Sequence, residues 1–275
     1  MIRSRLRSLL SAHVASACLL MLPALAAAPA HAAEAATTPA QRGAALNALL
    51  GHPATLPDRD DQLVLAPWPH APAGSGEAWV AAALLPLPND DQTLELWTGV
   101  LVRQGDGFRL LAGAAHGTID DFPWPIWHPS LQLDLIPYPL AAGDTAFGVR
   151  VLDDYTSTAH SDAYAAIRLY HLNGSTLAPV FDALTSTSTY DKDEAAQCAQ
   201  AATHGKHAPT EAQDADCDDQ ATTAAAYLLA FSPAQTRGHF DLLVRTRPAK
   251  GHPARLVKRA RWDGSGYQPR VFDGE

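Results

Sequence analysis

The feature that most constrains the fold is a succession of short apolar runs, separated by turn residues, from Gln62 to the C-terminus. Gly, Pro, Asn and Asp lie between most of the runs, a pattern typical of short antiparallel strands. Two alanine-rich runs, 79–85 and 224–231, would suit a helix equally well. The sequence predicts a mainly β chain of antiparallel hairpins and meanders, arranged as a sandwich or as an irregular propeller-like array. The runs are 63–66, 79–85, 94–102, 108–111, 131–136, 146–152, 163–171, 177–181, 224–231, 240–247, 255–262 and 267–272.

One short helix is predicted before the first strand, within residues 33–57. Thr38 can cap its first turn, Pro39 suits the first helical position, and Gln41 completes a capping box. Gly51 suits its end. Because the apolar residues of this segment recur on one side, we expect it to pack against the strands; they are Leu46, Leu49 and Leu50.

Residues 1–32 have the features of a secretory signal peptide. Three arginines precede an apolar run, and Ala30-His31-Ala32 follows as a small-x-small cleavage site. Cys18 lies inside the apolar run rather than after it, so we expect no lipid anchor there. No later stretch is apolar enough for a transmembrane segment. The sequence predicts a periplasmic or secreted protein, with a single β domain over 58–275.

Cys198 and Cys217 are the two cysteines that remain after the leader. In an oxidising compartment they are expected to form a disulfide, which would close an acidic insertion at about 191–219. The insertion also contains His204 and His207 beside several carboxylates. Their spacing matches no established zinc motif, so we predict neither a metal site nor another cofactor.

Charge is distributed unevenly along the chain. The net charge of −9 becomes −12 once Arg3, Arg5 and Arg7 are removed with the leader. Such an acidic protein is unsuited to non-specific nucleic-acid binding. Residues 191–219 nevertheless carry a net charge of −6, from eight acidic and two basic residues, whereas 237–270 carry +7, from nine basic and two acidic residues.

Many of the C-terminal basic residues are arginines at alternating positions. Since side chains alternate along a strand, Arg245 and Arg247 should share one face of the first strand. Arg255, Arg259 and Arg261 should share one face of the second. Two alternatives remain open. Either the acidic insertion covers these arginines, or they stay open and bind an anionic glycan, a lipid head group or an acidic protein partner.

A second candidate region is the proline-interrupted loop expected over 116–129. It carries Trp124 and Trp127 next to Asp120 and Asp121. The tryptophans would stack on a sugar or peptide if exposed, and would plug the end of a β core if buried. With the two aspartates as carboxylates, this loop offers an alternative function, a hydrolase of cell-envelope glycans.

Established catalytic motifs are missing from the sequence. There is no Gly-x-Ser-x-Gly elbow, no His-Glu-x-x-His and no glycine-rich phosphate loop. His160 and Asp162 are interpreted as a turn pair rather than an acid–base dyad. We therefore assign no catalytic residue and expect a non-enzymatic binding or structural role.

Overall fold

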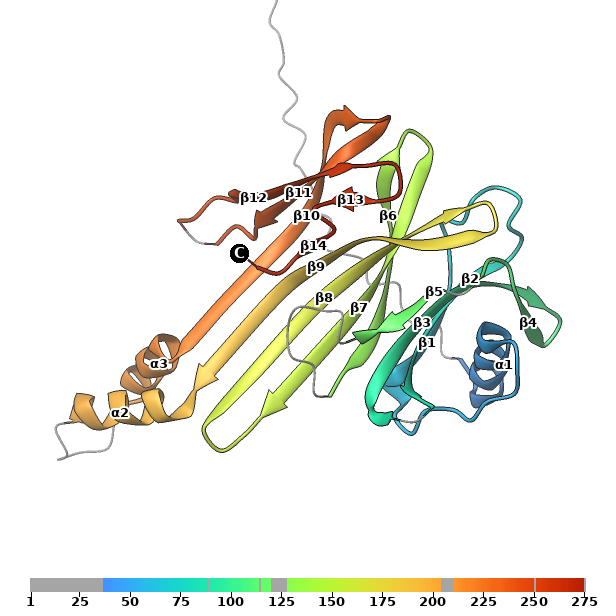
Figure 1. Ribbon diagram of the computed structural model, residues 1–275. Coiled ribbons are helices and arrows are strands. Elements are labelled where there is room, and N and C mark those ends of the chain that lie inside the picture. The colour runs from blue at the N-terminus through green and yellow to red at the C-terminus, as the bar shows by residue number, and fades with distance from the viewer. Residues whose placement is uncertain are drawn as a thin grey trace, which may run out of the picture. The chain divides into compact units, whose positions relative to one another are not determined.

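Two antiparallel β-sheets account for most of the chain, which confirms the predicted fold class (Figure 1). The computed structural model describes residues 37–88, 90–113, 115–119, 128–203, 210–249 and 251–274. They belong to one compact unit, 31–275. The predicted leader, 1–32, lies outside the described residues.

Helix α1, Pro39–Leu50, begins and ends where the sequence predicts. The Thr38 hydroxyl accepts the N–H of Gln41 at 3.2 Å, and the Gln41 side chain accepts the N–H of Thr38 at 2.9 Å. Gly51 ends the helix with a φ of 76°, a conformation that suits glycine. The buried face of α1 packs against the first sheet so closely that a Cβ on Gly99 would lie 2.5 Å from Leu49 Cδ1.

The first sheet has the strand order β1-β2-β3-β4, and β5 pairs with the other half of the long β3. A 3-10 turn, η1 (Asp60–Gln62), leads into it. Successive side chains of its strands point to opposite faces of the sheet, and both faces are apolar. One face packs under α1, and the other faces the second sheet. The strands are β1 Leu63–Pro67, β2 Ala78–Leu87, β3 Asp90–Gln104, β4 Gly107–Leu110 and β5 Ala115–Thr118.

The second sheet has the order β13-β12-β11-β10-β9-β8-β7-β6. The first residues of β10 pair with β9, and the remainder pairs with β11. The short β14 pairs in parallel with β9 further along that strand. The strands are β6 Ser130–Ala141, β7 Asp144–Thr156, β8 His160–Asn173, β9 Thr176–Asp191, β10 Thr222–Thr236, β11 His239–Thr246, β12 Leu256–Trp262, β13 Tyr267–Gln268 and β14 Val271–Phe272.

Both faces of the central strands β7 to β9 are buried along half of their length. On one face, Phe147, Val149 and Tyr170 pack against the first sheet, as in a sandwich. On the other face, Ile167 and Phe181 pack against the β11–β12 hairpin. One face of strands β10 to β12 therefore lies in the core. The other face carries exposed residues on β10 and β12, whereas Asp241 and Leu243 of β11 are buried on it.

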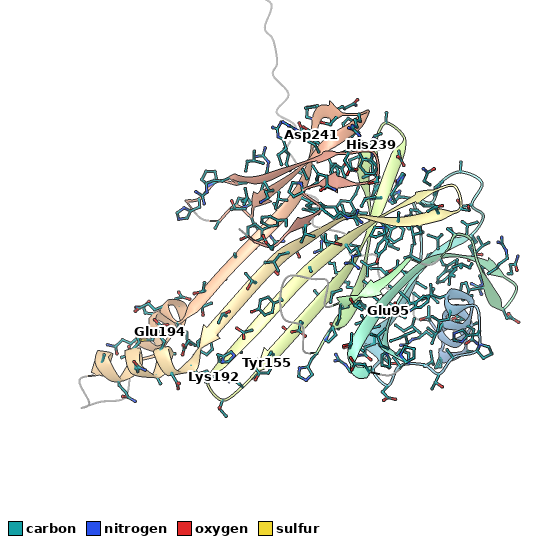
Figure 2. The ribbon with its side chains drawn as sticks, viewed as in Figure 1. Glu95, Tyr155, Lys192, Glu194, His239 and Asp241 are labelled. Carbon is teal, nitrogen blue, oxygen red and sulfur yellow. A yellow bond between two sulfur atoms is a disulfide. The ribbon has the colours of Figure 1, made fainter. Side chains whose placement is uncertain are left out.

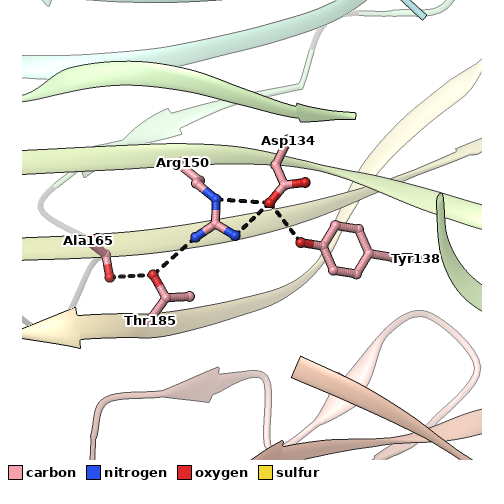
Figure 3. A network of polar contacts seen from close by, with 5 residues as sticks. All are labelled: Asp134, Tyr138, Arg150, Ala165 and Thr185. Carbon is pink, nitrogen blue, oxygen red and sulfur yellow. Dashed lines mark hydrogen bonds and ion pairs between the residues drawn. The ribbon is translucent and has the colours of Figure 1, made fainter. Parts of the chain in front are cut away.

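A network of polar side chains joins four strands of the second sheet (Figure 3). Asp134 Oδ2 accepts hydrogen bonds from Arg150 Nε at 2.9 Å, from Arg150 Nη2 at 2.6 Å and from the Tyr138 hydroxyl at 2.9 Å. Arg150 Nη1 also donates to Thr185 Oγ1 at 3.3 Å, and this hydroxyl donates to the carbonyl of Ala165 at 2.9 Å. Burial and the Asp134 carboxylate raise the pKa of Tyr138 well above its ordinary value, so its hydroxyl stays protonated.

The acidic insertion is folded as a pair of helices, α2 (Lys192–Thr203) and α3 (Glu211–Gln220). The predicted disulfide is present: Cys198 and Cys217 are bonded, one from each helix, with their Cα atoms 5.5 Å apart. The insertion is therefore helical over these described residues. A capping box formed by Thr210 and Gln213 starts α3, as Thr38 and Gln41 start α1.

Within the described residues, every helix is too short or too polar to cross a membrane.

Candidate binding face

The strand register determines which C-terminal arginines share a surface. Leu243 of β11 pairs with Arg259 of β12, and Arg245 pairs with Leu256. Side chains of directly paired residues point to the same side of a sheet, so Leu243, Arg245 and Arg259 point the same way. They point away from Leu242 and Val244, which lie in the core. Leu243 itself is buried. We call the exposed residues on this side the arginine face; it comprises Leu228, Arg245, Leu256, Arg259 and Arg261.

One row of this face combines an arginine with two exposed leucines. Arg245 pairs with Leu228 of β10 on one side and with Leu256 of β12 on the other. Leu228 is 38% exposed and Leu256 is 48% exposed, and they are two of the three large apolar residues that are exposed in the described structure. The row therefore offers a cationic group between two apolar side chains.

A buried aspartate lies beneath the other two arginines. Asp241 Oδ2 is 3.6 Å from Arg259 Nη1 and 3.8 Å from Arg261 Nε. Its other oxygen accepts a hydrogen bond from the Thr236 hydroxyl at 2.7 Å. The Asp241 side chain is only 5% exposed, whereas those of Arg259 and Arg261 are 41% and 64% exposed. The carboxylate thus orients both guanidinium groups while leaving much of each open to solvent.

The prediction that Arg255 shares a face with Arg259 and Arg261 is wrong. The register shifts by one residue between Val244 and Arg245, which makes Val257 an additional residue on β12. The carbonyl of Arg255 accepts the N–H of Thr246 at 2.9 Å, so Arg255 lies opposite Thr246 and on the other side of the hairpin. Arg247 is exposed just beyond β11, where its N–H donates to the Ala226 carbonyl at 2.7 Å.

The acidic insertion does not pair with these arginines in the described structure. The carboxylate that lies near Arg259 and Arg261 is Asp241, from the adjacent strand. In Figure 2, Glu194 of α2 lies at one end of the long strands, far from Asp241 and His239 of β11. Of the two arrangements that the sequence leaves open, coverage by the insertion is therefore not observed.

Aromatic packing holds the hairpin from its inner side. Trp262 of β12 is buried, and the imidazole of His239 stacks on it with ring centroids 4.0 Å apart and an interplanar angle of 6°. Tyr267 of β13 meets Trp262 edge-to-face at 5.3 Å, and its hydroxyl donates to the Phe240 carbonyl at 2.9 Å. These contacts fix β12, from which Arg259 and Arg261 project.

Asp263 closes the turn between β12 and β13. Its Oδ1 accepts the N–H groups of Ser265 at 2.8 Å and Gly266 at 3.1 Å, together with the Ser265 hydroxyl at 3.0 Å. These bonds stabilise the carboxylate form, and they lower the pKa of Asp263 from 3.8 to about 2. The turn therefore depends on an ionised aspartate.

The tryptophan-rich region is only partly described. Trp124, Trp127, Asp120 and Asp121 lie outside the described residues, so their roles in binding or hydrolysis stay predictions. The first residues of the predicted loop, 116–118, belong to strand β5, which pairs with β3. At the other end, the N–H of His128 donates to the carboxylate of Asp153, a buried residue of β7.

The structure brings Ser157, His160 and Asp162 together at the turn between β7 and β8. His160 Nε2 lies 3.2 Å from Asp162 Oδ2, and His160 Nδ1 lies 3.3 Å from Ser157 Oγ. The Ser157 hydroxyl also accepts the N–H groups of Ala159 at 3.2 Å and His160 at 3.0 Å, and it lies 3.0 Å from the His160 carbonyl. This bonding is that of a serine turn, and it agrees with the structural interpretation of the pair.

Metal ligation has no support in the part of the chain that the structure describes, where no group of three His, Cys, Asp or Glu side chains could hold an ion. His204 and His207 lie outside that part. In comparisons with protein families, curated proteins and solved structures, the chain matched none.

Proposed function

We propose that this chain is an exported, non-enzymatic binding protein whose arginine face binds an anionic partner. One observation carries the proposal: Arg245, Arg259 and Arg261 project from one face of a hairpin whose other face packs on the core through Leu242, Val244 and Ala260. Guanidinium groups bind phosphate or carboxylate groups through paired hydrogen bonds, which suits this role. Export rests on the predicted leader alone.

The local charge of the face supports binding despite the acidic chain. Asp241 offsets one of the three arginines and is itself shielded from solvent. A ligand approaching from outside therefore meets guanidinium groups before it meets the carboxylate. Electrostatic attraction of this kind is screened by salt, so binding should weaken steeply as ionic strength rises.

Retention on immobilised heparin, a polymer of sulfate and carboxylate groups, tests the proposal. The wild-type protein should be retained at low salt, and the double variant Arg259→Glu with Arg261→Glu should elute with the unbound fraction. The matched control, Arg103→Glu with Arg109→Glu, makes the same change in net charge on the first sheet. The proposal fails if the wild type is not retained, or if both double variants lose retention equally.

A further inference from the structure

The described structure contains a second charged surface, formed by α2, α3 and the residue before them. We call it the acidic hairpin. Its described carboxylates are all exposed, and among its described residues the only basic one is Lys192, whose ammonium donates to the Ser157 carbonyl. The exposed carboxylates are Asp191, Asp193, Glu194, Asp216, Asp218 and Asp219.

Several bonds hold the acidic hairpin in one conformation. The disulfide joins α2 to α3, and Cys217 is buried. Asp191 Oδ1 caps α2 by accepting the N–H groups of Asp193 and Glu194, each at 2.9 Å. Asp218 accepts the Tyr190 hydroxyl at 2.8 Å, which ties α3 to β9. The carboxylates are thus presented on an ordered element rather than on a flexible loop.

The acidic hairpin is placed away from the arginine face of its own chain. It leaves the sheet at Asp191 and returns at Thr222, where β9 pairs with β10. Arg245 lies opposite Leu228, about six residues or roughly 20 Å further along β10. Within the described residues, no ion pair joins Arg245 or Arg247 to a carboxylate of the acidic hairpin. Each chain therefore carries two complementary surfaces that it does not bring together.

We propose that the arginine face of one copy of this chain binds the acidic hairpin of a second copy. The inference rests on the proposed function and identifies the anionic partner as this hairpin. The arginine face carries three guanidinium groups against Asp241, and the acidic hairpin carries six exposed carboxylates against Lys192. Carboxylates are groups that guanidinium forks recognise. The two surfaces differ, so the contact is head-to-tail, and each copy keeps one free surface for the next. Assembly into rings or chains follows.

Sedimentation velocity over a range of concentrations tests the inference. At about 20 mM NaCl, the wild type should grow beyond the monomer as concentration rises, and it should return to monomer at about 0.5 M NaCl. Two variants each remove one surface and should each stay monomeric. The face variant carries Arg245→Gln, Arg259→Gln and Arg261→Gln, and the hairpin variant carries Asp193→Asn, Glu194→Gln, Asp216→Asn and Asp219→Asn.

Mixing the two variants is the decisive step. Each retains the surface that the other lacks, so an equimolar mixture should form a dimer and nothing larger. Asp191 and Asp218 are left unchanged because they cap α2 and hold α3, and unchanged melting temperatures verify that both variants fold. Arg255→Gln removes an arginine from the side of the β11–β12 hairpin opposite the arginine face, and this variant should assemble like the wild type.

The inference is overturned if the wild type stays monomeric at low salt, or if the mixture of variants does. Heparin retention of the same proteins distinguishes failure of this inference from failure of the proposed function. Retention that depends on the arginine face, without self-association, leaves the binding function standing and refutes the second copy as the partner. If neither self-association nor retention through the arginine face is observed, the proposed binding function is refuted as well.

Discussion

The buried carboxylate of Asp241 lies 3.6 Å from the guanidinium of Arg259 on the adjacent strand. This pair crosses from β11 to β12, and it makes the arginine face partly neutral from within. The aspartate beneath the arginines therefore lowers the net positive charge that a ligand meets on this face.

Substituting Asp241 by Asn should strengthen anion binding and weaken the fold at the same time. The change removes a negative charge beneath Arg259 and Arg261, while an amide oxygen can still accept the Thr236 hydroxyl. We expect elution from heparin at higher salt and a free energy of unfolding lower by about 1 to 3 kcal/mol. Elution at unchanged or lower salt would show that Asp241 does not govern the charge of the face.

Two glycine substitutions should change stability in opposite directions. A Cβ on Gly148 would lie 2.5 Å from Ile167 Cδ1, so Gly148→Ala should destabilise by about 1 to 3 kcal/mol. Adding Ile167→Val, which removes that methyl group, should recover part of the loss. Gly43 lies inside α1 with nothing within 4 Å of an added Cβ, so Gly43→Ala should stabilise by about 0.5 to 1 kcal/mol. Urea denaturation measures all three, and equal effects at both glycines would refute the packing argument.

Opening the disulfide should affect the acidic hairpin more than the sheets. The bond closes a loop with a sequence separation of 19, for which chain entropy gives a stabilisation of roughly 3 kcal/mol. A Cys198→Ser, Cys217→Ser variant should show faster hydrogen exchange in α2 and α3, with the exchange of β7 and β8 nearly unchanged. Uniformly faster exchange would indicate that the hairpin supports the whole domain.

Asp263 should make stability depend on pH in the acid range. Its pKa is lowered to about 2 in the folded chain, so its stabilising contribution is present above its unfolded value of 3.8. That contribution is lost as pH falls through about 2. Asp263→Asn should reduce stability at pH 7, and the variant should lose less on acidification from pH 4 to 2 than the wild type does. Parallel pH profiles in thermal unfolding would contradict the role of the ionised carboxylate.

Local signals in the sequence predicted α1 and most strand positions, because capping residues, turn glycines and apolar alternation act within a few residues. The same capping signal at Thr210 and Gln213 marks the start of α3, in a segment for which the sequence analysis assigns no helix. The second half of β9 was also missed. Its Thr-Ser-Thr-Ser-Thr sequence has no apolar alternation, and it is extended because β8 and β10 pair with it on both sides.

The arginine face shows where alternation alone fails. Arg245 and Arg259 do share a face, whereas the extra residue at Val257 moves Arg255 to the opposite one. A one-residue shift reverses every side chain beyond it, and nothing in the local sequence identifies this bulge. The ion pairs with Asp241 depend on the same register and could not be assigned before it was known.

The opposite orientation of Arg245 and Arg255 also provides the most direct test of the arginine face. Arg245→Glu and Arg255→Glu change the net charge equally, at positions in neighbouring segments but on opposite sides of the hairpin. The measurement is the salt concentration at which each variant elutes from heparin. Arg245→Glu should elute at much lower salt than the wild type, whereas Arg255→Glu should elute close to the wild type. Equal shifts for the two variants would contradict a binding site on this face.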